Sequence, residues 1–341
     1  MTFVAHDPTD SNLKCVVSTH VDDFRALDNC PYLTRRLHDA LKERFEEVTG
    51  NCPSTSFAGV SLIQHSNGAC SVHQAPYIER VASLIGVVHM PPVDVPCEHD
   101  IFKRSITASD CLPVDTNIYC SLTGHLIQSL KTRDEHRHIV SHLCSRNSTP
   151  DVGDYRKALH LLRYLYTTRF MGRVFSSSST VIFAHADAAF ANHLGGLSSE
   201  AFFLSVGSAN APFASRAKAQ TDVATCPMIA EYMSATSSCK AIELFRRFSE
   251  ELGWLVSGPT VLRVDNNTAR CLATAPEVTK GALHLNVGYH YIRQLIVQGI
   301  VVLEQVTSAA MRADVMTKVF ARAVFKRLRD SLLNRSALPT E

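Results

Sequence analysis

The chain has 341 residues, enough for two or three domains with a sizeable buried core, and its 45% hydrophobic content and near-zero mean hydropathy are typical of a globular protein. A formal charge of +2 does not by itself indicate a nucleic-acid binder, so any basic surface must be local. Because we find no signal-peptide core, no run of about 18 apolar residues and no C-x-x-C pair among the eleven cysteines, we expect a cytoplasmic or nuclear protein with reduced thiols, neither secreted nor bound to a membrane.

The start of the chain predicts a β-hairpin followed by a helix. Residues 12–24, N-L-K-C-V-V-S-T-H-V-D-D-F, form the pattern of two strands joined by a short turn, with Asp22 and Asp23 at its tip. In residues 32–45 apolar side chains recur at the helical period, at Leu33, Leu37, Leu41 and Phe45.

The middle of the chain predicts a proline-rich linker and then helices. Four prolines punctuate residues 90–118, and helical patterns dominate from Tyr119 onward. His136, His138 and His142 lie within two helical turns, and the last two could share a face. Without Cys or acid partners at ligand spacing, zinc is disfavoured, and we expect a polar helix face.

The last part of the chain predicts alternating strands and helices. The expected elements are a strand from residue 180 that runs into Asp187, a hairpin at 202–206 and 212–215 followed by a basic turn at 215–220, a helix at 231–252, a strand at 261–265, a helix at 285–298 closed by Gly299, a strand at 300–306 and a helix at 314–333. The order βββαβαβα predicts a mixed sheet flanked by helices, which is the order of a ribonuclease H-like fold.

Four acids occupy comparable places in these elements. Asp187 and Asp265 end short apolar strands, whereas Glu231 and Asp314 open helices. Such acids can converge at one end of a sheet, where their charges would repel unless divalent cations neutralised them. Hard oxygen ligands suit Mg²⁺, for which Mn²⁺ can substitute, and two such ions roughly 3.5–4 Å apart promote phosphodiester cleavage.

The motifs around these acids resemble those of copia-type (Ty1-like) retrotransposon Pol polyproteins. The matching segments are D-A-A-F-A-N at 187–192, I-A-E-Y-M-S at 229–234, V-D-N-N-T-A at 264–269, L-H-L-N-V-G-Y-H-Y-I-R at 283–293 and R-A-D-V-M-T-K at 312–318. All five come in the family's order and at similar spacings. The resemblance implies a ribonuclease H domain at 177–335 that follows the C-terminal part of a reverse transcriptase.

The same family has counterparts upstream. Its Y-V-D-D palm hairpin resembles H-V-D-D at 20–23, which implies a metal-binding role for Asp22 and Asp23 in a truncated palm at 1–73. A mostly helical thumb and connection would occupy 74–175, with motifs such as T-R-D at 132–134. Because only 21 residues precede Asp22, too few for the first palm acid and the fingers, we expect no polymerase activity from this chain alone.

The implied activity is cleavage of RNA in RNA–DNA hybrids by an endoribonuclease of the ribonuclease H type, a magnesium-dependent hydrolase. Asp187, Glu231, Asp265 and Asp314 would be both the catalytic residues and the ligands of two Mg²⁺. The expected nucleic-acid contacts are Arg216, Lys218, Gln220, Asn266, His284 and Lys318. Further basic candidates lie in the helical part, at Arg156, Lys157, Arg163 and Arg169. The expected partners are a hybrid or other nucleic acid and the rest of a Pol protein.

Departures from the family pattern leave one alternative open, a catalytically inactive remnant or a domesticated nucleic-acid-binding module. Ala189 and Ile229 stand where the family often has acids, Asn286 replaces Asp, and no histidine lies between Thr307 and Ala313. A decayed remnant, however, has no reason to keep all four proposed metal ligands, and all four are present.

Overall fold

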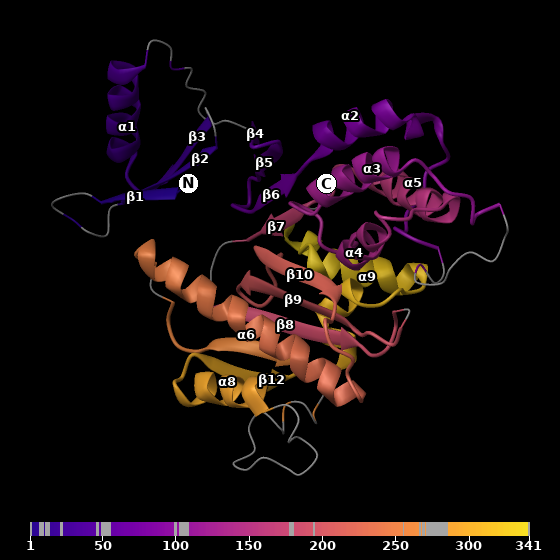
Figure 1. Ribbon diagram of the computed structural model, residues 1–341. Coiled ribbons are helices and arrows are strands. Elements are labelled where there is room, and N and C mark those ends of the chain that lie inside the picture. The colour runs from indigo at the N-terminus through magenta and orange to yellow at the C-terminus, as the bar shows by residue number, and fades with distance from the viewer. Residues whose placement is uncertain are drawn as a thin grey trace.

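A small antiparallel sheet and one helix form the N-terminal unit (Figure 1). The computed structural model describes residues 2–6, 10, 14–20, 23–45, 48, 56–98, 101, 109–176, 181–193, 195–254, 256–265, 267, 270 and 286–339. The elements of the unit are β1 Thr2–His6, β2 Lys14–His20, β3 Asp23–Asp28 and α1 Pro31–Arg44. Leu33 of α1 packs against Cys15 and Val17 of β2, so the predicted strands and helix are confirmed.

A second antiparallel sheet joins two distant parts of the chain. Its order is β4-β5-β6-β7, with β4 Ser56–Phe57, β5 Val60–Gln64, β6 Cys70–His73 and β7 Arg173–Phe175. A Cβ atom at Gly172 would lie 1.9 Å from the carbonyl oxygen of Val72. Only glycine therefore fits at position 172, where the chain passes close to the backbone of β6 just before β7 pairs with that strand.

Between these strands in sequence, the described residues form four α-helices. They are α2 Ala75–Ile85, α3 Thr116–Ser129, α4 Arg137–Ser145 and α5 Val152–Thr167, with the 3-10 turn η1 Val87–His89 after α2. The side chain of Asp115 caps α3, and Asp151 and Asp154 form a capping box that starts α5. The predicted dominance of helices after the linker is confirmed.

The largest sheet has five strands in the order β10-β9-β8-β11-β12. Its strands are β8 Ile182–Ala189, β9 Ser199–Val206, β10 Ala214–Ala219, β11 Thr260–Val264 and β12 Val301–Gln305. The first three are antiparallel, and β11 is parallel to both β8 and β12. The helical elements are α6 Pro227–Glu251, α8 Asn286–Val297, α9 Arg322–Leu332 and the 3-10 turns η3 Ser308–Ala310, η4 Arg312–Met316 and η5 Arg335–Ala337.

Both faces of this sheet are buried. Along β9, Phe202 and Leu204 pack with α6 and α8, whereas Ala201 and Phe203 belong to a second apolar cluster on the opposite face. This alternation is the two-residue period of a strand. The second cluster also contains apolar residues of α2 to α5, η4 and α9, so the helical part and this sheet share one core (Figure 1).

The predicted order βββαβαβα is confirmed, and Gly299 has the positive φ of +68° expected after a helix. The predicted basic turn at 215–220 is wrong, because most of it belongs to strand β10. The single helix predicted at 314–333 is also wrong, because the chain leaves helical structure between η4 and α9. None of the described helices combines the length and apolar character needed to cross a bilayer.

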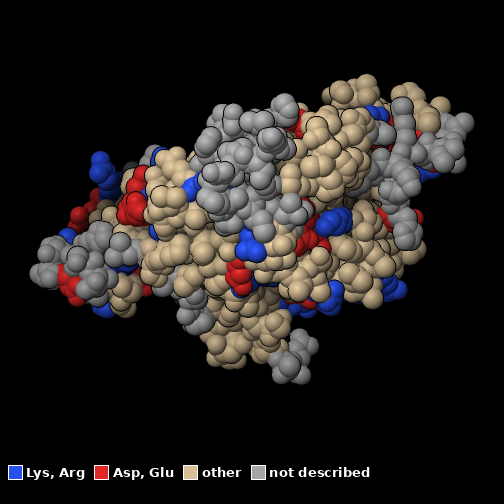
Figure 2. Space-filling model, turned by 90° about the horizontal axis from the view of Figure 1, so that it is seen from below, with Lys and Arg blue, Asp and Glu red and all other residues tan. Residues whose placement is uncertain are grey.

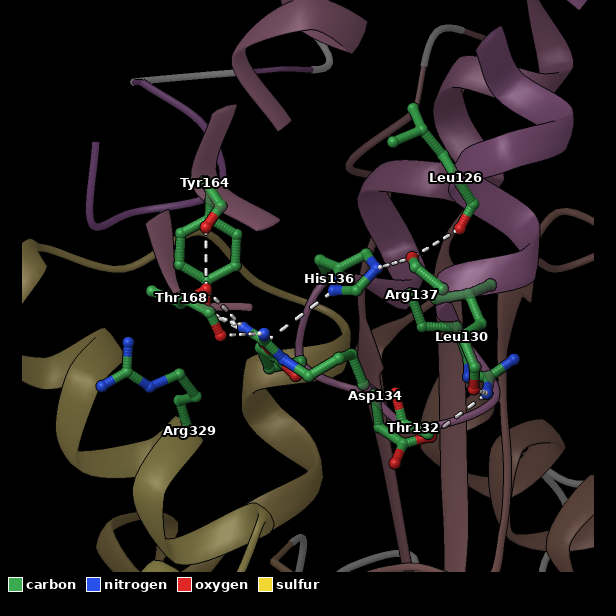
Figure 3. Close-up of polar contacts among 12 residues, drawn as sticks. Leu126, Leu130, Thr132, Asp134, His136, Arg137, Tyr164, Thr168 and Arg329 are labelled. Atoms are coloured by element: carbon green, nitrogen blue, oxygen red, sulfur yellow. Dashed lines mark hydrogen bonds and ion pairs between the residues drawn. The ribbon is translucent and has the colours of Figure 1, made fainter. Parts of the chain in front are cut away.

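The polar helix face predicted for the three histidines is wrong as well. His136, His138 and His142 are all buried, because α4 packs between the other helices and strand β10. A hydrogen bond of 2.9 Å joins Nε2 of His136 to Ser129 Oγ. Figure 3 shows the ring of His136 beside α3. Tertiary packing therefore overrides the polar character of this segment.

A buried ionic network lies just before these histidines, at Arg133 and Glu135. Arg133 and Glu135 are 0% exposed, and their side chains are 2.6 Å apart. The guanidinium also donates to the hydroxyl of Tyr164 and to the carbonyl oxygen of Thr168, both at 2.9 Å (Figure 3). Burial raises the pKa of the Glu135 carboxyl, but the positive charge of Arg133 outweighs burial and holds that pKa well below its usual range.

The adjacent Asp134 connects the helical part to two sheets. Its buried carboxylate accepts hydrogen bonds from Arg137, from Arg173 of β7 and from the hydroxyl of Ser215 of β10. Arg133 and Asp134, which follow α3, thus connect α5, β7 and β10.

Replacing Arg133 by Met should destabilise the whole fold. The substitution leaves the carboxylate of Glu135 buried without its counter-charge, which costs about 3–5 kcal/mol. Urea unfolding measures the loss. Arg247→Met is the matched control, because Arg247 pairs with Glu243 on an exposed helix face and should change stability by less than about 1 kcal/mol. Equal effects of the two substitutions would contradict the assigned role of the network.

Candidate metal centre

Asp187 lies near the end of the central strand and is fully buried. Its neighbours Ala186 and Ala188 pack in apolar clusters with residues of α6. Because side chains alternate along a strand, the carboxylate of Asp187 points to the opposite face. There the hydroxyl of Thr317, in the break after η4, donates a hydrogen bond to Asp187 Oδ2.

Strand register brings Asp265 to Asp187. In the parallel pair of β8 and β11, Arg263 lies opposite His185, so Asp265 and Asp187 follow at the same height two residues on. Asp314 reaches the same point from η4. One oxygen each of Asp187, Asp265 and Asp314 lies within 4.8 Å of the other two, although the three acids come from separate elements.

Glu231 approaches from the first turns of α6. Ser234, three residues on, donates 2.8 and 3.1 Å hydrogen bonds to the carbonyl oxygens of Asp187 and Ala201, which pins α6 to the sheet. Glu231 is only 8% exposed, and its Oε2 has no hydrogen-bond partner within the described part of the chain. Burial and the negative charges of Asp187 and Asp265 raise its pKa from 4.5 to about 9.

Lys318 is the cation of the site. Its Nζ lies 2.6 Å from Asp314 Oδ1 and 3.2 Å from Asp187 Oδ1. Burial lowers the pKa of Lys318, but the carboxylates outweigh burial and raise it above its usual value. Even with this partner, the pKa of Asp187 is raised to about 7, chiefly by burial and also by the charge of Asp314.

The residues fit a divalent metal. Three hard carboxylate oxygens converge, and the fourth carboxylate, that of Glu231, is buried with an oxygen that receives no hydrogen bond from the described residues. Buried carboxylates in such a group remain charged only when cations compensate them. Sequence reasoning predicted all four acids as ligands, and the structure groups three of them, Asp187, Asp265 and Asp314. It missed Thr317, because only the tertiary structure shows that its hydroxyl reaches Asp187.

The residues predicted to contact nucleic acid lie in different environments. Arg216 is exposed on β10, whereas Lys218 lies 3.5 Å from the carboxylate of Glu200. Gln220 is buried and donates a 2.8 Å hydrogen bond to the carbonyl oxygen of Ala230, so it supports the start of α6. Asn266, His284 and Asp22 lie outside the described residues, and of Asp23 only its place at the start of β3 is described.

The four basic residues of the helical part all hold other parts of the chain. Arg156 and Arg169 pair with Asp110 and Glu79, respectively. The side chains of Lys157 and Arg163 donate to the backbone carbonyl oxygens of Ile101 and Pro91. Three of these contacts therefore fasten the segment between α2 and α3 onto α5.

Comparison with known proteins finds Pol polyproteins of plant transposons. The chain is 24% identical over 317 residues to the retrovirus-related Pol polyprotein from transposon TNT 1-94 of Nicotiana tabacum, a match that covers 91% of this chain and 24% of the relative. It is 25% identical over 309 residues to those from transposons RE1 and RE2 of Arabidopsis thaliana, covering 90% of this chain and 21% of each relative. These relatives confirm the predicted resemblance to copia-type Pol proteins, of which the chain spans a quarter or less. No family model matches the chain.

Solved structures that are similar to part of the chain are ribonucleases H1. The enzyme of the archaeon Halobacterium salinarum is 20% identical with a TM-score of 0.29, over 38% of this chain and 86% of that one. The LC11 enzyme isolated from compost is 12% identical with a TM-score of 0.31, over 46% of this chain and 98% of that one.

Replacing Glu231 by Gln should stabilise the metal-free protein, increasingly so at high pH. The folded state keeps a proton on Glu231 up to a pKa of about 9, whereas the unfolded chain releases it near 4.5, so the wild type loses stability as the pH rises between these values. We expect a gain of at least about 1 kcal/mol at pH 8 from unfolding curves in a chelator.

Glu250→Gln is the matched control, because Glu250 is exposed on the same helix and should show no such pH-dependent gain. Addition of Mg²⁺ should make the wild type more stable than Glu231→Gln, the reverse of their order in a chelator. A wild type that is as stable as Glu231→Gln throughout would mean that Glu231 is not strained by burial.

Proposed function

We propose that this chain carries a ribonuclease H-type nuclease that cleaves the RNA strand of RNA–DNA hybrids with the help of two divalent metal ions. The observation that carries the proposal is the convergence of Asp187, Asp265 and Asp314 beside the buried carboxylate of Glu231, whose Oε2 has no hydrogen-bond partner among the described residues. Resemblance to retrotransposon Pol proteins supplies the substrate class. In this proposal residues 177–335 form the nuclease, 1–73 a truncated palm and 74–175 the thumb and connection.

The four carboxylates would hold the ions. Mg²⁺, or Mn²⁺ in its place, supplies activation of water and stabilisation of the leaving oxygen when bound. Asp187 is central, because it lies beside Asp265 through the strand register and contacts Thr317 and Lys318 on its other side. The hydroxyl of Thr317 orients the carboxylate of Asp187, which is a requirement for a preorganised site.

Products follow from the bond that breaks. Water would attack the phosphorus in line, and the 3′-oxygen of the preceding nucleotide would leave, which gives a 5′-phosphate and a 3′-hydroxyl. The hybrid would be recognised by its shape and by the 2′-hydroxyls of its RNA strand. The chain spans a quarter or less of its relatives, so further parts of a Pol protein are proposed partners.

Binding would have to use separate basic side chains. On the face seen in Figure 2, blue and red side chains are interspersed among the described residues, in keeping with the formal charge of +2. Arg216 on the edge strand β10 is exposed, so it is a candidate for a phosphate contact.

Cleavage of a labelled RNA–DNA hybrid in Mg²⁺ tests the proposed function. Asp265→Asn should lower the rate by roughly a thousandfold or more, because a lost metal ligand removes several kcal/mol of transition-state stabilisation. Asp39→Asn, at an exposed acid of α1, is the control and should leave the rate unchanged. Wild-type cleavage by Asp265→Asn would refute the metal role, and a folded wild type that binds hybrid without cutting would favour the binding-module alternative.

Replacing Arg216 by Ala should make binding of a hybrid less dependent on salt. Each lost phosphate contact reduces the log–log slope of affinity against salt concentration by about one. Fluorescence anisotropy in a chelator measures the slope without cleavage. Arg247→Ala, at an exposed arginine on α6, serves as the comparison. If both variants keep the wild-type slope, Arg216 makes no phosphate contact.

A further inference from the structure

Lys318 forms ion pairs with two of the four acids of the proposed metal centre. Its ammonium lies against one oxygen of Asp187 and one of Asp314, at 3.2 and 2.6 Å. Asp265 and Glu231 form no ion pair within the described part of the chain, and Oε2 of Glu231 has no hydrogen-bond partner there. Within the described residues, the ammonium thus forms ion pairs with Asp187 and Asp314 but with neither Asp265 nor Glu231.

The local backbone directs the lysine to this place. The chain leaves helical structure after η4, yet the amide of Lys318 still donates a 3.0 Å hydrogen bond to the carbonyl oxygen of Asp314. This i,i+4 relation stacks the lysine over the acid. The side chain is 35% exposed, so the ammonium can turn toward solvent without disturbing the core.

A divalent ion and the ammonium would compete for the same oxygens. Ligand distances for Mg²⁺ are about 2.0–2.1 Å, so an ion held by Asp187 and Asp314 would overlap with the observed position of Nζ. We propose that Lys318 occupies the Asp187–Asp314 cation position in the substrate-free protein, which then takes one divalent ion, on the side of Asp187, Glu231 and Asp265. This inference rests on the proposed metal role of the four acids.

A second ion enters when the lysine leaves. A phosphate of bound nucleic acid offers the ammonium another anionic partner, which combines the predicted nucleic-acid contact of Lys318 with its observed ion pairs. Lys318 is then a positioning residue that couples substrate binding to completion of the metal site.

The stoichiometry of Mn²⁺ binding to the full chain without nucleic acid tests this inference. Titration calorimetry should find one tight ion in the wild type and two in Lys318→Met. Any weak second ion in the wild type should bind at least about tenfold less tightly than the second ion of Lys318→Met, because the variant lacks the like charge. Lys318→Arg keeps the charge and should bind one ion. Lys240→Met, at an exposed lysine of α6, should also match the wild type.

Thermal unfolding gives a second readout. Lys318→Met should melt below the wild type in a chelator, since two acids lose their counter-ion, and should regain stability in Mn²⁺. Two tight ions in the substrate-free wild type, or unchanged binding in Lys318→Met, would overturn the inference. The wild-type stoichiometry decides the question even if Lys318→Met fails to fold. An enzyme that cleaves hybrid yet binds two ions without substrate would refute this inference alone, whereas a chain that binds no divalent ion would refute the proposed function as well.

Discussion

Burial of the carboxylate of Asp187 is the constraint around which this structure is arranged. A fully buried acid beside two further acids is unfavourable unless positive charge or hydrogen-bond donors compensate it. The protein supplies Lys318 and the hydroxyl of Thr317, and both come from the break between η4 and α9. The contacts of these two residues with Asp187 depend on that break. In one continuous helix from η4 to α9, Thr317 and Lys318 would follow the helix axis and would not both face the central strand.

The sheet that carries Asp187 depends on the helices that precede it. Apolar residues from α2 to α5 share one cluster with Phe203 of β9 and with α9. Asp134 adds a polar link, since its buried carboxylate bonds to Arg173 and to Ser215 of β10. Movement of the helical part would therefore expose one face of the sheet, which gives these helices a structural role whether or not they also contact nucleic acid.

Sequence reasoning could predict the features that local patterns encode. Acids such as Asp187 and Asp265 follow short apolar strands, and the alternation of strands and helices predicted both the element order and the meeting of these acids. It could not predict features that depend on distant neighbours. His138 is polar in sequence but buried by tertiary packing, and Arg163 has the sequence character of a phosphate ligand although it donates to the backbone of Pro91. In both cases the deciding partner lies far away in the chain.

The surroundings of Ile229 show what one departure from the family motifs does to the packing near Glu231. Ile229, which departs from the motif expected from the family resemblance, packs with Ala188, Ala224 and Ala230 in a small apolar cluster at the start of α6. This cluster lies next to Glu231. An isoleucine at position 229 therefore makes apolar contacts where an acid would carry a charge, and the four proposed ligands stay in place. If the chain were losing function at random, we would expect the buried acids to be replaced first, since removing a buried acid stabilises the metal-free fold. The buried Oε2 of Glu231, which has no partner among the described residues, is therefore accounted for by the proposed cation site.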